Sequence, residues 1–149
     1  MLKVDKILFP CDFTENSTKI LPYVMSMAEK YDSQVYILYV DELQEWGGHF
    51  IPHESLDTLR QESLNSAKKA MDKICEEELQ SCPGFQRKIV SGNPATEILK
   101  TIASEDIDMV VMGTHGRKGL EHALFGSVAE NVVKKSPVPV LIVNPHRLK

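Results

Sequence analysis

The sequence has few cysteines, no excess of basic residues and no long apolar run, and each shortage excludes a class of protein. Its three cysteines form no C-x-x-C pair, and the odd number argues against both a disulfide framework and a zinc site. The formal net charge of −4 argues against nucleic acid as the main partner. No apolar stretch approaches the roughly 18 residues that a membrane-spanning helix needs.

The amino-terminal stretch also lacks the apolar region and the small-residue cleavage site of a signal peptide. Asp5 and Lys6 stand directly before its first short apolar run. We therefore expect a cytoplasmic protein without a membrane partner or a nucleic-acid partner, and without a metal held by side chains alone.

Five short apolar runs alternate with stretches in which apolar residues recur at helical spacing. The chain has 149 residues, of which 42% are hydrophobic, and this is enough for one domain with a real core. Strands that alternate with helices favour a parallel sheet. The predicted fold class is α/β: a single doubly wound domain, residues 1–149, with a five-stranded parallel sheet in the order 3-2-1-4-5 and helices on both faces. The strands are expected at 6–11, 33–40, 85–92, 108–113 and 138–143.

Several local signals refine this prediction. Asn93 followed by Pro94 is typical of an N-cap and a first helical position. Pro22 falls inside the first helical stretch, where it predicts a helix that begins late or bends. The stretch 41–55 breaks the periodicity and indicates a loop, which Trp46 is expected to pack down.

A glycine-interrupted segment follows the fourth predicted strand. Gly113 ends that strand, Gly116 comes soon after, and Gly126 with Ser127 opens the last predicted helix. Glycine lets a ligand approach the backbone closely, and the first amides of a helix lack partners within it, so this pattern suits a phosphate group. Arg117 adds positive charge in the same segment. In a doubly wound sheet, ligands bind where the strand order reverses, which is after the first and fourth strands.

Two readings of this segment stay open on the residues alone. Glycines also end strands and begin helices where no ligand binds, and Ser127 could serve only as an N-cap. The segment contains no Walker loop G-x-x-x-x-G-K-[ST], and no G-x-G-x-x-G follows the first strand. A dinucleotide site is therefore disfavoured.

The stretch GTHGRKGLEHALFGS fits the pattern G-x2-G-x9-G-[ST], and on this pattern the chain resembles the ATP-binding branch of the universal stress protein family. The segments KILFPCDFTENS, VSGNPATEIL and SPVPVLIV resemble further parts of that family in the same order. The resemblance extends over nearly the whole chain and is weakest at 41–55.

The resemblance implies that ATP binds with Mg²⁺ or Mn²⁺ on its phosphates. Asp12 would bond the ribose or approach the phosphates and metal, and Val40 would meet adenine through its backbone. Backbone N–H groups around Gly126 would hold the phosphates. The implied nucleotide-binding residues are Pro10, Cys11, Asp12, Val40, Met112, Gly113, His115, Gly116, Arg117, Gly126, Ser127 and Val128.

Two of these residues also have plainer interpretations. Asp12 could cap the following helix without touching a ligand. Cys11 could be a small buried thiol, which we favour over a redox-sensitive group.

The resemblance implies an ATP-binding regulatory or protective module of the stress response. The alternative is a slow ATPase or phosphotransfer enzyme on the same fold. His115 is the only evident candidate base in the glycine segment, and no second carboxylate is placed to activate water, so we assign no catalytic residue. The apolar strand 138–143 lies at the sheet edge in the predicted order, and an exposed apolar edge invites pairing with another chain. We therefore expect a homodimer through this strand, as the resemblance also implies.

Overall fold

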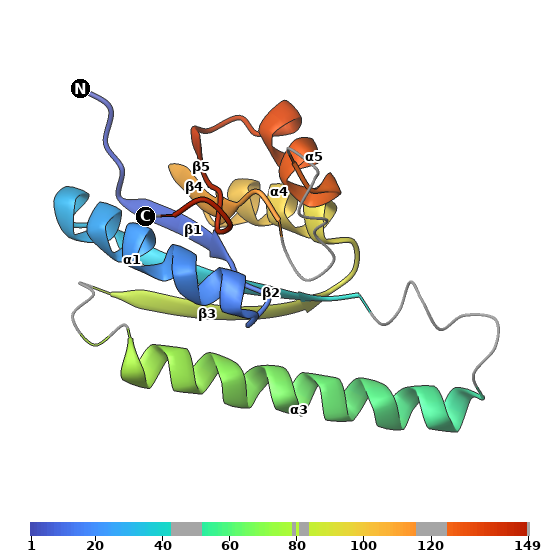
Figure 1. Cartoon of the computed structure of the whole chain (residues 1–149). Helices are drawn as coiled ribbons and strands as arrows, with labels where there is room; N and C mark the ends of the chain where they lie inside the picture. Colours follow the sequence, from blue (N-terminus) through green and yellow to red (C-terminus); the bar gives the residue numbers. More distant parts are fainter. Residues whose placement is uncertain (43–51, 79, 81–83, 116–124, 149) are drawn as a thin grey trace.

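The computed structural model describes residues 1–42, 52–78, 80, 84–115 and 125–148, and all the statements below concern these residues (Figure 1). They contain one parallel five-stranded sheet in the order β3-β2-β1-β4-β5, which confirms the predicted topology. The loop residue Trp46 lies outside the described residues. The strands are β1 (Lys6–Pro10), β2 (Gln34–Asp41), β3 (Phe85–Ser91), β4 (Met109–Gly113) and β5 (Val140–Val143).

Helices cover both faces of this sheet. In Figure 1, α3 runs below β3, while α4 and α5 lie together on the other side of the sheet. None of the described helices is long and apolar enough to cross a membrane. The helices are α1 (Glu15–Tyr31), α3 (His53–Glu77), α4 (Pro94–Ser104) and α5 (Ser127–Lys135).

The sheet divides the core into two apolar clusters. Alternate side chains of a strand point to opposite faces, so Ile7 and Phe9 of β1 pack with α1 and α3, whereas Leu8 packs with α4 and α5. All three side chains are buried. The central strands are therefore apolar on both faces, as expected for a parallel sheet covered on each side.

The first four strands match their predicted bounds to within one residue at each end, whereas α3 begins at His53, inside the predicted loop 41–55. Two further differences have a clear physical reason. Helix α1 begins at Glu15 and contains Pro22, so the expected late start is wrong, and the alternative of a bend stays a prediction. Pro22 and Thr18 are exposed, and the Thr18 carbonyl that loses its helical partner can therefore bond to water. Strand β5 begins at Val140, not at residue 138, because Pro139 has no N–H to donate to a sheet.

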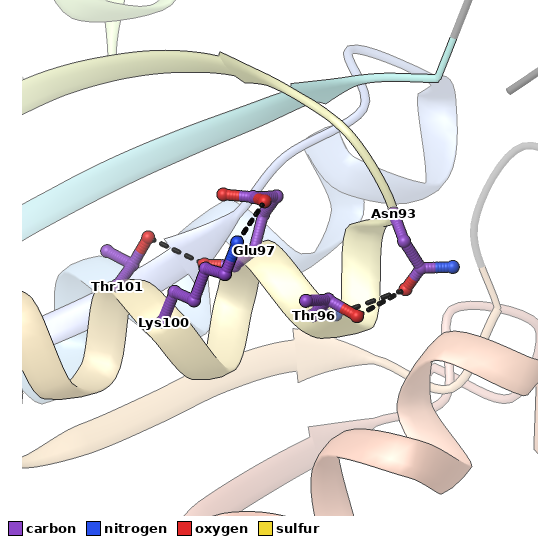
Figure 2. Close-up of polar contacts among 5 residues, drawn as sticks. All are labelled: Asn93, Thr96, Glu97, Lys100 and Thr101. Atoms are coloured by element: carbon purple, nitrogen blue, oxygen red, sulfur yellow. Dashed lines mark hydrogen bonds and ion pairs between the residues drawn. The ribbon is translucent and has the colours of Figure 1, made fainter. Parts of the chain in front are cut away.

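The amino terminus of α4 is closed by its own residues (Figure 2). The side-chain oxygen of Asn93 accepts hydrogen bonds from the Thr96 backbone N–H at 3.1 Å and from the Thr96 hydroxyl at 3.2 Å. Pro94 occupies the first turn, where its missing N–H costs nothing. The predicted N-cap is confirmed. The amino terminus of α5, on the same face of the sheet, is compared with it below.

We expect Asn93→Ala to lower the free energy of unfolding by about 1 kcal/mol, because the Thr96 amide loses its acceptor. Urea unfolding followed by circular dichroism measures this change. Asn93→Asp keeps an acceptor oxygen at the same position and should stay close to the wild type. Equal stability of Asn93→Ala and the wild type would contradict the capping role.

Candidate functional site

The carboxyl ends of β1, β2 and β4 open into a cavity of about 750 Å³. This volume falls within the range of about 300–1,000 Å³ that is usual for small-molecule sites. β1 lies between β2 and β4, so the cavity sits where the strand order reverses. Residues of α1, α3, α4 and α5 complete its walls.

The cavity brings together all the predicted site residues that the structure describes. Gly116 and Arg117 lie outside the described residues. Further lining residues were not foreseen from the sequence, among them Ser17, Thr114, Asp41, Glu42 and Ser63. The predicted residues that line the cavity are Pro10, Cys11, Asp12, Val40, Met112, Gly113, His115, Gly126, Ser127 and Val128.

The turn between β1 and α1 fixes the carboxylate of Asp12. One oxygen, Oδ1, accepts hydrogen bonds from the Thr14 backbone N–H at 3.0 Å, the Thr14 hydroxyl at 2.6 Å and the Ser17 hydroxyl at 2.5 Å. Phe13 adopts a left-handed conformation with φ of 61°, and its ring stacks on Tyr39 with centroids 5.0 Å apart. The N-cap of α1 is Thr14 and not Asp12, but the Asp12 carboxylate holds the turn before the helix, and Asp12 also lines the cavity.

The amino terminus of α5 differs from that of α4. Its N-cap is Gly126, so Ser127 is the first helical residue and not the N-cap. No side chain of the described residues caps this helix. The Gly126 N–H is already used, because it donates to the Thr114 carbonyl at 2.7 Å. The first-turn amides therefore lie at the cavity wall at the positive end of the helix dipole.

Gly126 is also a point of close backbone approach. A Cβ atom at this position would lie 3.1 Å from the Thr114 carbonyl oxygen, which is tighter than most real contacts. The absence of a side chain lets α5 begin directly beside the segment that follows β4. This requirement explains the glycine independently of any ligand, so both interpretations drawn from the sequence have structural support.

His115 is a buried imidazole on the wall of the cavity, with 4% of its surface exposed. Its Nδ1 lies 2.8 Å from the Thr114 hydroxyl, and its ring lies against His146 with centroids 5.4 Å apart. Among the described residues, its buried Nε2 has no hydrogen-bond partner. A buried polar atom of this kind usually has a partner, so Nε2 is suited to contact a bound molecule.

Cys11 is a buried thiol rather than a reactive one. It is 4% exposed, and burial raises its pKa from the ordinary value of 9.0 to about 11, although the Phe13 backbone and the Ser17 hydroxyl oppose the rise. A protonated thiol is neither a nucleophile nor a metal ligand. The interpretation of Cys11 as a small buried group is the one that the structure favours.

The raised pKa of Cys11 makes stability depend on pH above 9. Below pH 9 the thiol is protonated in both the folded and the unfolded protein. Between pH 9 and about 11 only the unfolded chain loses the proton, so the folded state becomes less stable as the pH rises. We expect ionisation of the Cys11 thiol to lower the free energy of unfolding by roughly 2–3 kcal/mol between pH 9 and about 11.

Urea unfolding of the wild type and of Cys11→Ala at a series of pH values isolates this contribution. The difference in unfolding free energy between the two proteins should be constant below pH 9 and should shrink as the pH rises towards 11. A difference that does not change with pH would show that the thiol titrates alike in both states.

Comparisons with known proteins agree with this architecture. The model of the universal stress protein family matches residues 3–144. Universal stress protein MJ0577 of Methanocaldococcus jannaschii is 35% identical over 153 residues, which cover 93% of this chain and 93% of the relative. The solved structure of MJ0577 has a TM-score of 0.84 to this chain, with 96% of this chain and 97% of the other covered.

Two further solved structures share the fold at 18% identity. One is a universal stress protein from Archaeoglobus fulgidus in complex with dAMP, with a TM-score of 0.61 and coverage of 97% of this chain and 100% of that chain. The other is a universal stress protein in complex with cAMP, with a TM-score of 0.62 and coverage of 97% and 99%. Both of those proteins therefore hold an adenine nucleotide.

Proposed function

Because the chain belongs to the universal stress protein family, we propose that its cavity binds an adenine nucleotide, and that this nucleotide is ATP. The observation that carries the proposal is the composition of the cavity wall, which combines the uncapped start of α5 with the fixed carboxylate of Asp12. The nucleotides held by the two neighbouring structures support the same ligand class.

In this proposal the phosphates lie at the start of α5. The backbone N–H groups of Ser127 and Val128 have no side-chain cap. They lie at the positive end of the α5 helix dipole, which favours an anion there. Nε2 of His115 supplies a further donor when it carries the proton. Gly116 and Arg117 remain predictions, since they lie outside the described residues.

In this proposal the ribose and the base lie across the carboxyl ends of β4, β1 and β2. Asp12, in the turn that follows β1, binds the ribose or the metal, while the backbone of Val40, next to the last residue of β2, meets the base. Met112 and Gly113, at the end of β4, flank the ribose. Parallel strands lie about 4.8 Å apart, so β4, β1 and β2 offer successive positions across about 10 Å.

A divalent cation on the phosphates is part of the proposed ligand. Mg²⁺ and Mn²⁺ prefer oxygen ligands, and nucleotide sites commonly hold them through one or two carboxylates together with the phosphates. Asp12 is the carboxylate to which we assign the metal, and it lines the cavity. No group of three or more potential metal-ligating side chains occurs in the described part of the chain, so the phosphates would supply much of the coordination.

The role that we propose is regulatory or protective rather than enzymatic. Nucleotide binding would favour one conformation of the protein over another and so change which partners it binds during stress. Chromatography of the material released when the purified protein is denatured tests the ligand assignment most directly. We expect an adenine nucleotide in that fraction.

Substitution of Gly126 tests the phosphate position. The side chain of Gly126→Val would press on the Thr114 carbonyl and cover the first amides of α5, so we expect ATP affinity to fall at least tenfold. Gly84→Val is the matched control, because among the described residues a Cβ there meets only the side chain of Gln34, at an ordinary contact distance of 3.5 Å or more. Calorimetric titration with Mg-ATP measures both variants, and wild-type affinity in Gly126→Val would contradict the phosphate site.

We also propose that the protein is a homodimer that pairs through β5. Strand β5 lies at the end of the sheet and pairs with β4 on one side only within the described chain. Antiparallel pairing with the β5 of a second copy would satisfy this edge and leave no free strand.

Sedimentation equilibrium at micromolar concentration tests this assembly. We expect a dimer for the wild type and a shift toward monomer or unfolding for Leu141→Lys, since a lysine in β5 disfavours pairing of two edges and Leu141 also packs against the core. Leu59→Lys, which places the same charge on an already exposed leucine of α3, should remain dimeric. A wild type that is monomeric at these concentrations would contradict the proposal.

A further inference from the structure

Two histidines follow neighbouring strands of the sheet. His115 comes two residues after the end of β4, and His146 comes three residues after the end of β5. Because β4 and β5 pair in parallel, both histidines lie at the same edge of the sheet. Their ring centroids are 5.4 Å apart, and the two rings are tilted by 57°. The topology therefore brings together two imidazoles that lie far apart in the sequence.

The chain around His115 is fixed by hydrogen bonds. The Thr114 N–H donates to the Val143 carbonyl at 2.9 Å, which extends the pairing of β4 with β5. The Thr114 carbonyl accepts the Gly126 N–H at 2.7 Å. The Thr114 hydroxyl lies 2.8 Å from Nδ1 of the imidazole. This leaves Nε2, which is buried and has no hydrogen-bond partner among the described residues.

The tail that follows β5 holds His146 against this ring. The side-chain oxygen of Asn144 accepts the His146 backbone N–H at 3.0 Å. The Asn144 carbonyl accepts the Arg147 N–H at 3.2 Å, so the chain turns here. Pro145 is buried, and Leu148 packs against the apolar cluster beneath α1 and α3. His146 itself is exposed, so a small cation can reach the pair from solvent.

The distance between the two rings matches that of two imidazoles on one metal ion. With Zn–N bonds of about 2.0–2.1 Å and tetrahedral geometry, the centres of two ligating rings lie roughly 5 Å apart. A ligating histidine usually has its other nitrogen fixed by a hydrogen bond. Nδ1 of His115 has such a contact with the Thr114 hydroxyl. Imidazole suits Zn²⁺ and related transition-metal cations, whereas Mg²⁺ prefers oxygen ligands.

We propose that His115 and His146 together bind a divalent transition-metal cation of the zinc class, with Nε2 of His115 as one ligand. The described residues contain no group of three or more potential metal-ligating side chains, so water completes the coordination. The cation ties the carboxyl-terminal tail to the end of β4. It is distinct from the cation proposed on the nucleotide phosphates, and it requires no nucleotide. Without it, Nε2 remains available as a phosphate donor.

Calorimetric titration of the nucleotide-free protein with ZnCl2 tests this site. We expect one Zn²⁺ per chain in the wild type, and a higher Tm in its presence because the cation binds the folded protein. His146→Phe keeps an aromatic ring against His115 but removes the ligating nitrogen. Zinc affinity should therefore fall at least tenfold in this variant, and its Tm should no longer rise with zinc. His115→Phe should behave in the same way.

His53→Ala is the matched control, because it removes a histidine from the start of α3 and should keep the wild-type affinity. Circular dichroism identifies the folded variants, and the exposed position of His146 makes its variant the decisive one. The inference is overturned if the wild type binds no Zn²⁺ or if folded His146→Phe binds it as the wild type does. An equal loss in His53→Ala would also overturn it, since the binding would then be spread over unrelated histidines. Titration with Mg-ATP tests the proposed function separately, so the two failures are distinguishable.

Discussion

The pairing of β1 with β2 on one side and β4 on the other is the constraint on which the rest of the site depends. Ile7 lies opposite Val35 of β2 and Met109 of β4 in parallel register. Parallel strands end at the same edge of a sheet, so this register brings three separate segments of the chain to one place. The carboxylates, the glycines and the buried histidine of the cavity meet there, although more than a hundred residues separate the first from the last.

The energy that fixes this register comes from both faces of the sheet at once. A slip of one residue would move Ile7 and Phe9 out of the cluster beneath α1 and α3 and put Leu8 in their place. In the observed register, Ile7, Leu8 and Phe9 are all buried, each against the helices on its own face. The positions of the cavity residues are therefore a consequence of apolar packing far from the cavity.

The sequence was sufficient for the strands, their order and the residues at their ends, because apolar runs, glycines and prolines act locally. It was insufficient where the role or the conformation of a residue depends on a contact with a distant part of the chain. Asp41 resembles the first polar residue of a loop until α3 is placed over it. Phe13 takes a backbone conformation that is typical of glycine or asparagine, which no local rule indicates. Which of Gly126 and Ser127 is the N-cap of α5 was likewise decided by the tertiary structure and not by local sequence.

The stacking of Phe13 on Tyr39 has a mechanical consequence. The left-handed turn costs of order 1 kcal/mol in a residue with a side chain, and an aromatic pair can offset about that amount. Tyr39 belongs to the strand that ends in Asp41, and Phe13 adjoins Asp12. The stacked rings therefore connect the turn that carries Asp12 to the strand that ends in Asp41, and both of these acidic residues line the cavity. Loss of either ring would therefore remove a contact shared by two walls of the cavity.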